Sequence, residues 1–307
     1  MQRFRCRSCR RTFSRQTFRH DYRDRRPEVN AELFLDLVSS TSLRQTARRR
    51  GMGVGATQRK FRKIARTCRL LHRNLCTALP ANRTFLLDEE ETYEKASIRP
   101  LTLAMLIEKQ TYFVVATMAG PIRRLAAAGT ARRRRQDRDE ARRGRRRDRS
   151  RLCVRATLRN LAARLDGGAL TLLSDEKASY ATLGIEVFGT ALQHATVSSQ
   201  RMRGTFNPLF PINLTVSMSR DNCGRLRRDA WLVTERRRCL QLQMHLFVTY
   251  RNYVRRRHNY DDPQHTPAVL LGLLPRPLTA REVVAWRQDW GLNSIHPTKS
   301  TPEIAAA

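Results

Sequence analysis

Two short apolar runs that each lead to an aspartate constrain this chain more than any other feature. Residues 83–87 precede Asp88, and residues 169–174 precede Asp175. Buried strands deliver such residues to a fixed place at the edge of a sheet, where two carboxylates repel each other unless a divalent cation neutralises them. The two runs therefore predict strands that bring Asp88 and Asp175 to a shared metal ion.

The charge of the chain predicts a polyanionic partner. The chain has 307 residues, enough for one large domain with small attachments, and carries 60 Lys plus Arg against 27 Asp plus Glu, a formal net charge of +33. Arginine binds phosphate oxygens bidentately and releases counterions, so nucleic acid is the expected partner. A genome that favours arginine codons is the alternative explanation, and charge by itself indicates no sequence specificity.

Apolar segments and cysteines indicate the cellular compartment of the protein. No apolar run approaches the roughly 20 residues of a membrane span, and the first residues lack the apolar core of a signal peptide. Five of the seven cysteines are scattered singly, which is typical of reduced thiols. We therefore expect an intracellular protein.

The other two cysteines, Cys6 and Cys9, form a CxxC motif with aromatic residues on either side. This pattern is typical of one half of a zinc ribbon, but a closed structural zinc site needs four ligands, and only His20 is nearby. Zn²⁺ binding at an incomplete site is one interpretation of residues 1–26, as a remnant of a ribbon. Two exposed thiols are the other.

Residues 27–80 are predicted to form a helix-turn-helix DNA-binding domain. Apolar spacing predicts helices over residues 28–38, 43–50 and about 56–75, with Ser42 as a cap of the second and glycines before the third. A recognition helix meets DNA through residues near its start. An ordinary three-helix bundle with a solvated basic face is the alternative. The predicted DNA-binding residues are Gln58, Arg59, Lys60, Arg62 and Lys63.

Beyond residue 81 the pattern changes to extended segments. Residues 84–87, 101–107 and 112–118 are predicted to form an antiparallel meander. Residues 132–151 follow with twelve arginines and four acids, which indicates either a solvated helix or a loop, and either a phosphate-binding arm or filler. A helix over 152–165, a Gly167-Gly168 turn and a fourth strand over 169–173 complete the order.

This order, with one Asp on the first strand and another after the fourth, resembles the ribonuclease-H-like core of DDE transposases from bacterial insertion sequences. The resemblance runs from the CxxC segment to residues 250–253 and 266–273, which resemble the closing segment of many such enzymes. It implies an α/β fold: an RNase-H-like mixed sheet flanked by helices over 81–260, preceded by a small helical helix-turn-helix domain. It also implies a basic insertion near 130–151 and a C-terminal tail over 261–307.

In that family two aspartates and a third residue hold a pair of Mg²⁺ or Mn²⁺ ions that promote cutting and joining of DNA strands. Asp88 and Asp175 match the first two positions. No Glu stands about 35 residues after Asp175, and Glu186 comes too soon. Asn213 is our choice for the third ligand, since an amide oxygen can ligate a hard cation, although it adds no charge. A helix N-cap is the alternative role of Asn213, and Asp221 and Glu235 are the other candidates.

The remaining predictions concern the C-terminal part and the function. Residues 232–253 are predicted to form one long amphipathic helix, and Trp286 and Trp290 to pack in a core rather than to stack on bases.

The resemblance implies a nucleoid-associated enzyme of the bacterial cytoplasm that acts as a homo-oligomer on the terminal inverted repeats of its element and on target DNA. A decayed relative that binds DNA as a regulator is the main alternative, and a DNA-packaging protein would explain the charge alone.

Overall fold

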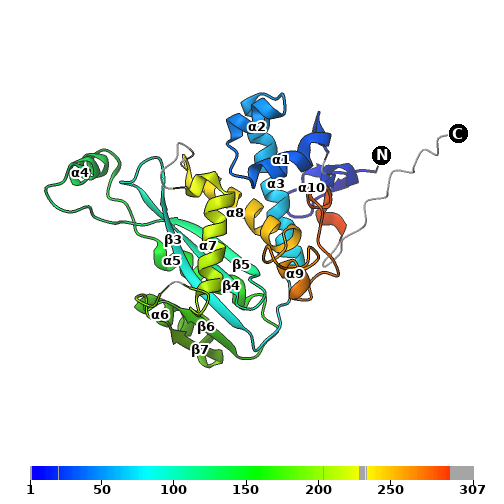
Figure 1. Cartoon of the computed structure of the whole chain (residues 1–307). Coiled ribbons are helices and arrows are strands. Elements are labelled where there is room, and N and C mark those ends of the chain that lie inside the picture. Colours follow the sequence, from blue (N-terminus) through cyan, green and yellow to red (C-terminus); the bar gives the residue numbers. More distant parts are fainter. Residues whose placement is uncertain (1, 20, 203, 228–231, 233, 291–307) are drawn as a thin grey trace.

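The protein has an α/β fold built on a five-stranded mixed sheet that helices flank on both faces (Figure 1). The computed structural model describes all residues except 1, 20, 203, 228–231, 233 and 291–307. The strands lie in the order β5-β4-β3-β6-β7. They are β3 (Thr84–Tyr93), β4 (Pro100–Glu108), β5 (Val114–Pro121), β6 (Leu170–Ser174) and β7 (Leu192–Thr196).

The predicted meander and the predicted fourth strand are both confirmed. Strand β4 pairs antiparallel with β3 and with β5, whereas β6 pairs parallel with β3 and with β7. The parallel pairing needs a crossover, which residues 122–169 supply with α4 (Ala131–Arg143) and α5 (Ser150–Ala162). α6 (Ala178–Phe188) then crosses from β6 to β7.

Alternation along β3 sends its apolar side chains to two cores. Phe85 and Leu87 belong to one cluster with residues of α5 and α6, and Leu86 belongs to another with residues of α7 (Phe210–Asn222) and α8 (Arg237–Thr249). Successive side chains of a strand point to opposite faces of the sheet. Helices α5 and α6 therefore cover one face, and α7 and α8 cover the other (Figure 1).

Side chains close the outer edge of β5, which would otherwise offer unpaired backbone groups. The Asn252 side chain accepts from Val114 N (2.9 Å) and donates to Val114 O (2.8 Å). Gln241 of α8 accepts from Ala119 N (2.9 Å) and donates to Thr117 O (3.1 Å). These amides take the place of a neighbouring strand, so the edge is capped without further pairing.

The N-terminal helices pack against the C-terminal part of the chain. The helices are α1 (Asn30–Leu37), α2 (Leu43–Arg49) and α3 (Val54–Leu75). Ser42 caps α2, as predicted, and the cap is a capping box in which Gln45 takes part. α3 lies along α8, and the apolar cluster that contains Phe61 and Leu71 of α3 also contains sheet residues. One core thus crosses the predicted boundary at residue 80.

Shorter elements complete the chain. α10 (Ala280–Ala285) packs on α1 and α3, and α9 (Pro267–Leu270) packs on residues 250–254. Trp286 is buried in the same apolar cluster, as predicted; the Trp290 side chain lies outside the described part. The others are β1 (Phe4–Arg5), β2 (Thr12–Phe13), η1 (Arg15–Phe18), η2 (Pro27–Val29), η3 (Gly189–Ala191), η4 (Gly224–Leu226), the π-helix η5 (Tyr250–Val254) and η6 (Gln288–Trp290).

Two predicted boundaries are wrong. The strand that begins at Thr84 does not end before Asp88 but continues to Tyr93, because Glu89 and Glu90 have cationic partners that neutralise them inside the fold. The long helix begins at Arg237 rather than at 232, and Thr234 instead forms a bridge with Glu94. No helix among the described residues combines the length and the apolar character that crossing a membrane requires.

Basic residues 132–143 form α4, which lies apart from the sheet (Figure 1). Its arginines are mostly exposed, whereas two of its acids point back to the body of the protein. Arg99 Nε lies 2.8 Å from Asp139 Oδ2, and Arg123 Nε lies 2.9 Å from Glu140 Oε1. Of the predicted basic segment 132–151, residues 132–143 are therefore a solvated helix that ion pairs hold in place, and residues 144–149 are irregular.

Substitution of Gly120 tests the packing of α5 on β5. A Cβ atom at position 120 would lie 2.2 Å from Cys153 Sγ. We expect Gly120→Ala to lower the free energy of unfolding by about 1–3 kcal/mol, measured by urea denaturation, because the core is overpacked there. In a Cys153→Ala background the clash is gone, so the same change should cost at least about 1 kcal/mol less. Equal costs in both backgrounds would contradict this packing.

Candidate metal centre

Strand pairing places Asp88 beside Asp175. β3 and β6 are parallel, and their last paired residues are Leu87 and Ser174. Asp88 follows Leu87 on β3, and Asp175 directly follows the end of β6, so the two aspartates come immediately after a pair of backbones that lie about 4.8 Å apart. Both side chains are half-buried, and Asp175 accepts a hydrogen bond from Lys177 N (3.1 Å) as the chain turns away from β6. The predicted pair is therefore brought together.

Alternation places Asp88 on the face of the sheet that α7 covers. Leu86, two residues earlier, packs with Ile212 and Val216 of α7, and Glu90, two residues later, contacts the same helix. Asp88 accepts a hydrogen bond from Glu89 N (2.7 Å). Asp88 thus lies between two positions of β3 that contact α7.

Glu89 points to the opposite face and collects four polar groups there. Its carboxylate accepts hydrogen bonds from Thr102 Oγ1 (2.7 Å), Ser150 Oγ (3.1 Å) and Tyr180 Oη (3.1 Å), and forms an ion pair with Lys177 Nζ. This cluster was not predicted from the sequence. Its one sequence signal is Lys177, which follows Asp175 by two residues and so had to lie near the candidate pair.

The electrostatics of this cluster keep Glu89 ionised and Tyr180 protonated. Burial acts to raise the pKa of Glu89, but hydrogen bonds from Lys177 and Thr102 outweigh it and hold that pKa below its ordinary value. Burial raises the pKa of Tyr180, and the negative charges of Glu89, Asp88 and Asp175 raise it further. Both aspartates therefore lie within electrostatic reach of the Tyr180 hydroxyl.

Glu90 fixes α7 on the sheet. It is fully buried; Arg220 Nε lies 2.6 Å from Glu90 Oε1, and Ser219 Oγ donates to Glu90 Oε2 at 2.9 Å. α7 begins at Phe210 with Leu209 as its N-cap, so the N-cap role considered for Asn213 is wrong. Asn213 lies in the first turns of α7 instead, because the helix begins three residues earlier.

The third ligand stays a prediction. Asn213 is half-buried, and within the described ranges no hydrogen bond joins its side chain to either aspartate. Asp221 lies on the surface, 3.6 Å from Arg227, and Glu186 pairs with Arg155. Among the described residues no group of three His, Cys, Asp or Glu side chains is arranged to hold a metal ion. Oxygen atoms of two adjacent carboxylates nevertheless suit a hard divalent cation.

The predicted DNA-binding residues of α3 fall into two groups. Lys60 is buried and donates to Asp24 Oδ1 (2.5 Å), Arg26 O (2.7 Å) and Asn30 Oδ1 (2.8 Å), which uses all three of its donors. Lys63 donates to Tyr22 O (3.0 Å), and burial lowers its pKa. Both lysines tie residues 22–30 to α3. Arg59 is exposed, and Gln58 and Arg62 are half-exposed.

The CxxC motif forms the turn of the β1–β2 hairpin. Cys6 N donates to Arg11 O (2.8 Å) and Arg10 N donates to Cys6 O (2.9 Å), so the turn is closed by its backbone. A hydrogen bond from the Cys9 backbone, with others from Ser8 and the Cys9 thiol, lowers the pKa of Cys6 to about 6. A thiolate of this kind suits a soft metal, but Cys6 and Cys9 supply only two ligands, and His20 lies outside the described residues.

Comparison of the chain with models of protein families gives no match, and none of the curated proteins compared with it is similar. The geometry of the site is therefore the basis of the functional argument.

Replacement of Lys177 tests the electrostatics beside the aspartates. We expect Lys177→Met to raise the pKa of Glu89 above its ordinary 4.5, because burial then acts without the hydrogen bond and the charge of Lys177, which oppose it most strongly. ¹³C NMR of the glutamate carboxyl groups measures this pKa. Lys95→Met, which changes an exposed lysine, should leave it unchanged.

Glu89 also makes the stability of the protein depend on pH. With the pKa of Glu89 depressed in the folded state, its contribution to stability is present above pH 4.5 and is lost as the pH falls through the folded value. In Lys177→Met the pKa of Glu89 in the folded state is expected above 4.5, so ionised Glu89 destabilises the variant at neutral pH. Protonation of Glu89 removes this cost, and the variant should regain stability relative to wild type as the pH falls. Unfolding curves with the same pH slope for both proteins would contradict the role of Lys177.

Proposed function

We propose that the protein is a transposase that cuts and joins DNA strands by metal-dependent phosphoryl transfer at Asp88 and Asp175. The observation that carries this proposal is the register of β3 and β6, which ends at Leu87 and Ser174 and leaves the two aspartates side by side. Paired carboxylates on adjacent strands need a cation to neutralise them, and the strongly basic chain favours a phosphodiester substrate.

The order of the sheet supports an RNase-H-like core. An antiparallel meander of three strands comes first, its first strand lies in the centre, and two parallel strands follow on the other side. This is the arrangement that the resemblance to DDE transposases implies, with the first aspartate on the central strand. The second aspartate directly follows the neighbouring strand, which also agrees.

The chain's own residues would position the reacting groups. Asp88, Asp175 and the amide oxygen of Asn213 would hold Mg²⁺ or Mn²⁺; when bound, the metal activates the attacking oxygen and stabilises the leaving oxygen. The Glu89–Lys177 pair holds the start of α6 and so fixes the turn that contains Asp175. The Glu90–Arg220 pair holds α7 against β3 and so fixes the helix that carries Asn213.

Recognition of DNA is assigned to the start of α3. Gln58, Arg59 and Arg62 have exposed or half-exposed side chains there, whereas Lys60 and Lys63 serve the packing of residues 22–30. A transposase that joins two element ends needs more than one protomer, so self-association on DNA in the bacterial cytoplasm, at the nucleoid, belongs to the proposal. Zn²⁺ at Cys6 and Cys9 would require two ligands from elsewhere.

A decayed DNA-binding regulator is the second candidate function. It is favoured by the absence, among the described residues, of a third acidic or histidine ligand beside the two aspartates. An amide brings no negative charge, and the affinity of a site for a divalent cation decreases when it has fewer charged ligands.

Strand cleavage separates the two functions. Purified protein should be incubated with Mg²⁺ or Mn²⁺ and duplexes that carry the DNA flanking its coding sequence, and nicked strands measured on denaturing gels. We expect Asp88→Asn and Asp175→Asn each to reduce cleavage at least about a thousandfold, because each removes a charged metal ligand, while DNA binding persists. Asp221→Asn, a surface carboxylate, is the matched control and should retain activity.

The third ligand is tested in the same assay. Asn213→Ala should abolish cleavage, and Asn213→Asp should retain it because a carboxylate also ligates Mg²⁺. If Asp221→Ala abolished cleavage and Asn213→Ala did not, the assignment of Asn213 would be wrong. DNA binding without metal-dependent cleavage by the wild-type protein would favour the regulator.

A further inference from the structure

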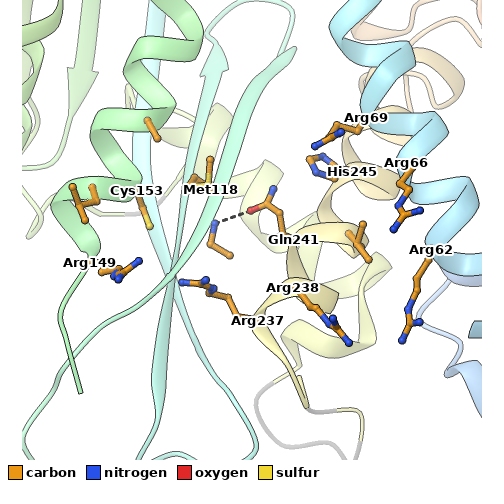
Figure 2. A pocket seen from close by; sticks show the side chains of 14 residues that line it. Arg62, Arg66, Arg69, Met118, Arg149, Cys153, Arg237, Arg238, Gln241 and His245 are labelled. Carbon is orange, nitrogen blue, oxygen red and sulfur yellow. Dashed lines mark hydrogen bonds between the residues drawn. The ribbon is translucent and has the colours of Figure 1, made fainter. Parts of the chain in front are cut away.

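A basic groove lies along the outer edge of the sheet, away from the two aspartates. Its floor is the edge of β5 at Met118 and Ala119 together with α8, which lies between β5 and α3, and its walls are α3 on one side and α5 on the other (Figure 2). Its volume is about 630 Å³. Register across β3, β4 and β5 aligns Asp88 with Met105 and Thr117, so the floor begins two strands, roughly 10 Å, from Asp88.

One wall of the groove is a stripe of arginines on α3. Positions 59, 62, 66, 69 and 73 are all arginine, and their spacing of three and four residues places them on one face of the helix. The start of α8 adds Arg237 and Arg238 between the two walls, and Arg149, the N-cap residue of α5, adds an arginine from the opposite wall (Figure 2). The arginines that line the groove are Arg62, Arg66, Arg69, Arg149, Arg237 and Arg238.

The arginine side chains of this groove have no carboxylate partner among the described residues, although the Glu94 carboxylate accepts a hydrogen bond from Arg237 N (2.9 Å). None of its six arginines forms an ion pair with a carboxylate in the part of the chain that the structure describes, and no acid is among its lining residues. Elsewhere many arginines are paired, and even α4 places its acids against arginines. A general excess of arginine codons raises the number of arginines but does not exclude acids from one surface.

Two neighbouring cavities share lining residues with the groove and extend it. A second cavity, of about 660 Å³, shares Arg69, Met118, Gln241 and His245 with it, follows β5 to Val115 and also has no acidic lining residue. A third shares Arg62 and Arg66 and opens toward the N-terminal hairpin. Burial lowers the pKa of His245 to about 4, so its ring is neutral at pH 7 and the positive charge comes from arginine.

The floor between the arginine walls is apolar. Met118, Leu152, Ala156 and Leu242 line it together with Ala119, whose N–H is already bonded to Gln241 (Figure 2). Phosphates can therefore meet guanidinium groups on the walls while flat apolar groups meet the floor. A volume in the range of small-ligand pockets admits a few nucleotides of one strand but not a double helix.

We propose that this groove binds a single strand of nucleic acid, with its phosphates on the arginine walls and its bases against the apolar floor. Basic grooves that follow the backbone are the general means of binding single strands, and the fork of arginine matches phosphate geometry. The inference goes beyond the function proposed above, because it concerns a second site and requires no cleavage.

Binding of a fluorescein-labelled dT12 oligonucleotide, followed by anisotropy in EDTA, tests the proposal. The variant Arg66→Ala/Arg69→Ala/Arg238→Ala removes three exposed arginines of the groove. Each lost phosphate contact should reduce the slope of log K against log salt by about 0.7, so three should reduce it by about 2 and lower affinity about 100-fold at 0.1 M salt. Replacement of the same three residues by lysine should restore most of the slope.

The matched control is Arg44→Ala/Arg142→Ala/Arg281→Ala, which removes the same charge from exposed arginines on α2, α4 and α10. It should change the affinity for dT12 less than tenfold. Circular dichroism should show that both variants are folded, as expected for exposed positions. Equal losses in the two variants would overturn the proposal.

Two further ligands test its chemistry. A 12-base-pair duplex should lose much less affinity than dT12 in the groove variant, because it contacts only the rim; an equal loss would rule out single-strand binding. An oligo-glutamate peptide of equal charge should bind wild-type protein at least tenfold more weakly than dT12, and binding of equal strength would show a site for acidic peptides instead. Because EDTA prevents cleavage, failure of the transposase proposal would leave these outcomes unchanged.

Discussion

Neutralisation of the acids on β3 holds the described structure together. Three consecutive glutamates follow Asp88 on the central strand, a position where an unpaired charge would destabilise the sheet. Each glutamate instead binds a cation from another segment: Glu89 the start of α6, Glu90 the end of α7, and Glu91 the chain that leads to α4. The cations are Lys177, Arg220 and Arg124. Helices from both faces are thereby fixed around the two aspartates.

The pairing pattern of the sheet could be predicted because it depends on local signals. Short apolar runs bounded by Gly, Pro and charged residues predicted the meander, the fourth strand and the place of Asp175, and the structure confirms them. Ser42 predicted the cap of α2 for the same reason, since an N-cap bonds a backbone group only three residues further on; the part of Gln45 in this cap was not predicted. The adjacency of Asp88 and Asp175 followed from the strand order.

Features that depend on distant partners could not be predicted. The continuation of β3 through Glu89 and Glu90 needs Lys177 and Arg220, which lie 88 and 130 residues away. Lys60 has the sequence context of a DNA contact, yet Asp24 and Asn30 surround it because residues 22–30 fold back over α3. A charged residue does not reveal from sequence whether its partner is water, phosphate or protein. The position of Asn213 within α7 was missed because no capping residue marks the helix start.

The closed edge of β5 explains why arginines from three distant segments converge. Gln241 and Asn252 satisfy β5 backbone groups, and His72 of α3 bonds Val115 O (2.9 Å), so α3 and the α8 region must both lie along this edge. Burial lowers the pKa of His72 to about 4, which keeps its ring neutral in this role. The arginine stripe lies on the neighbouring face of α3, beside this edge, since Arg69 and His72 line the same cavity. The same contacts that remove an aggregation-prone edge thus create the basic groove.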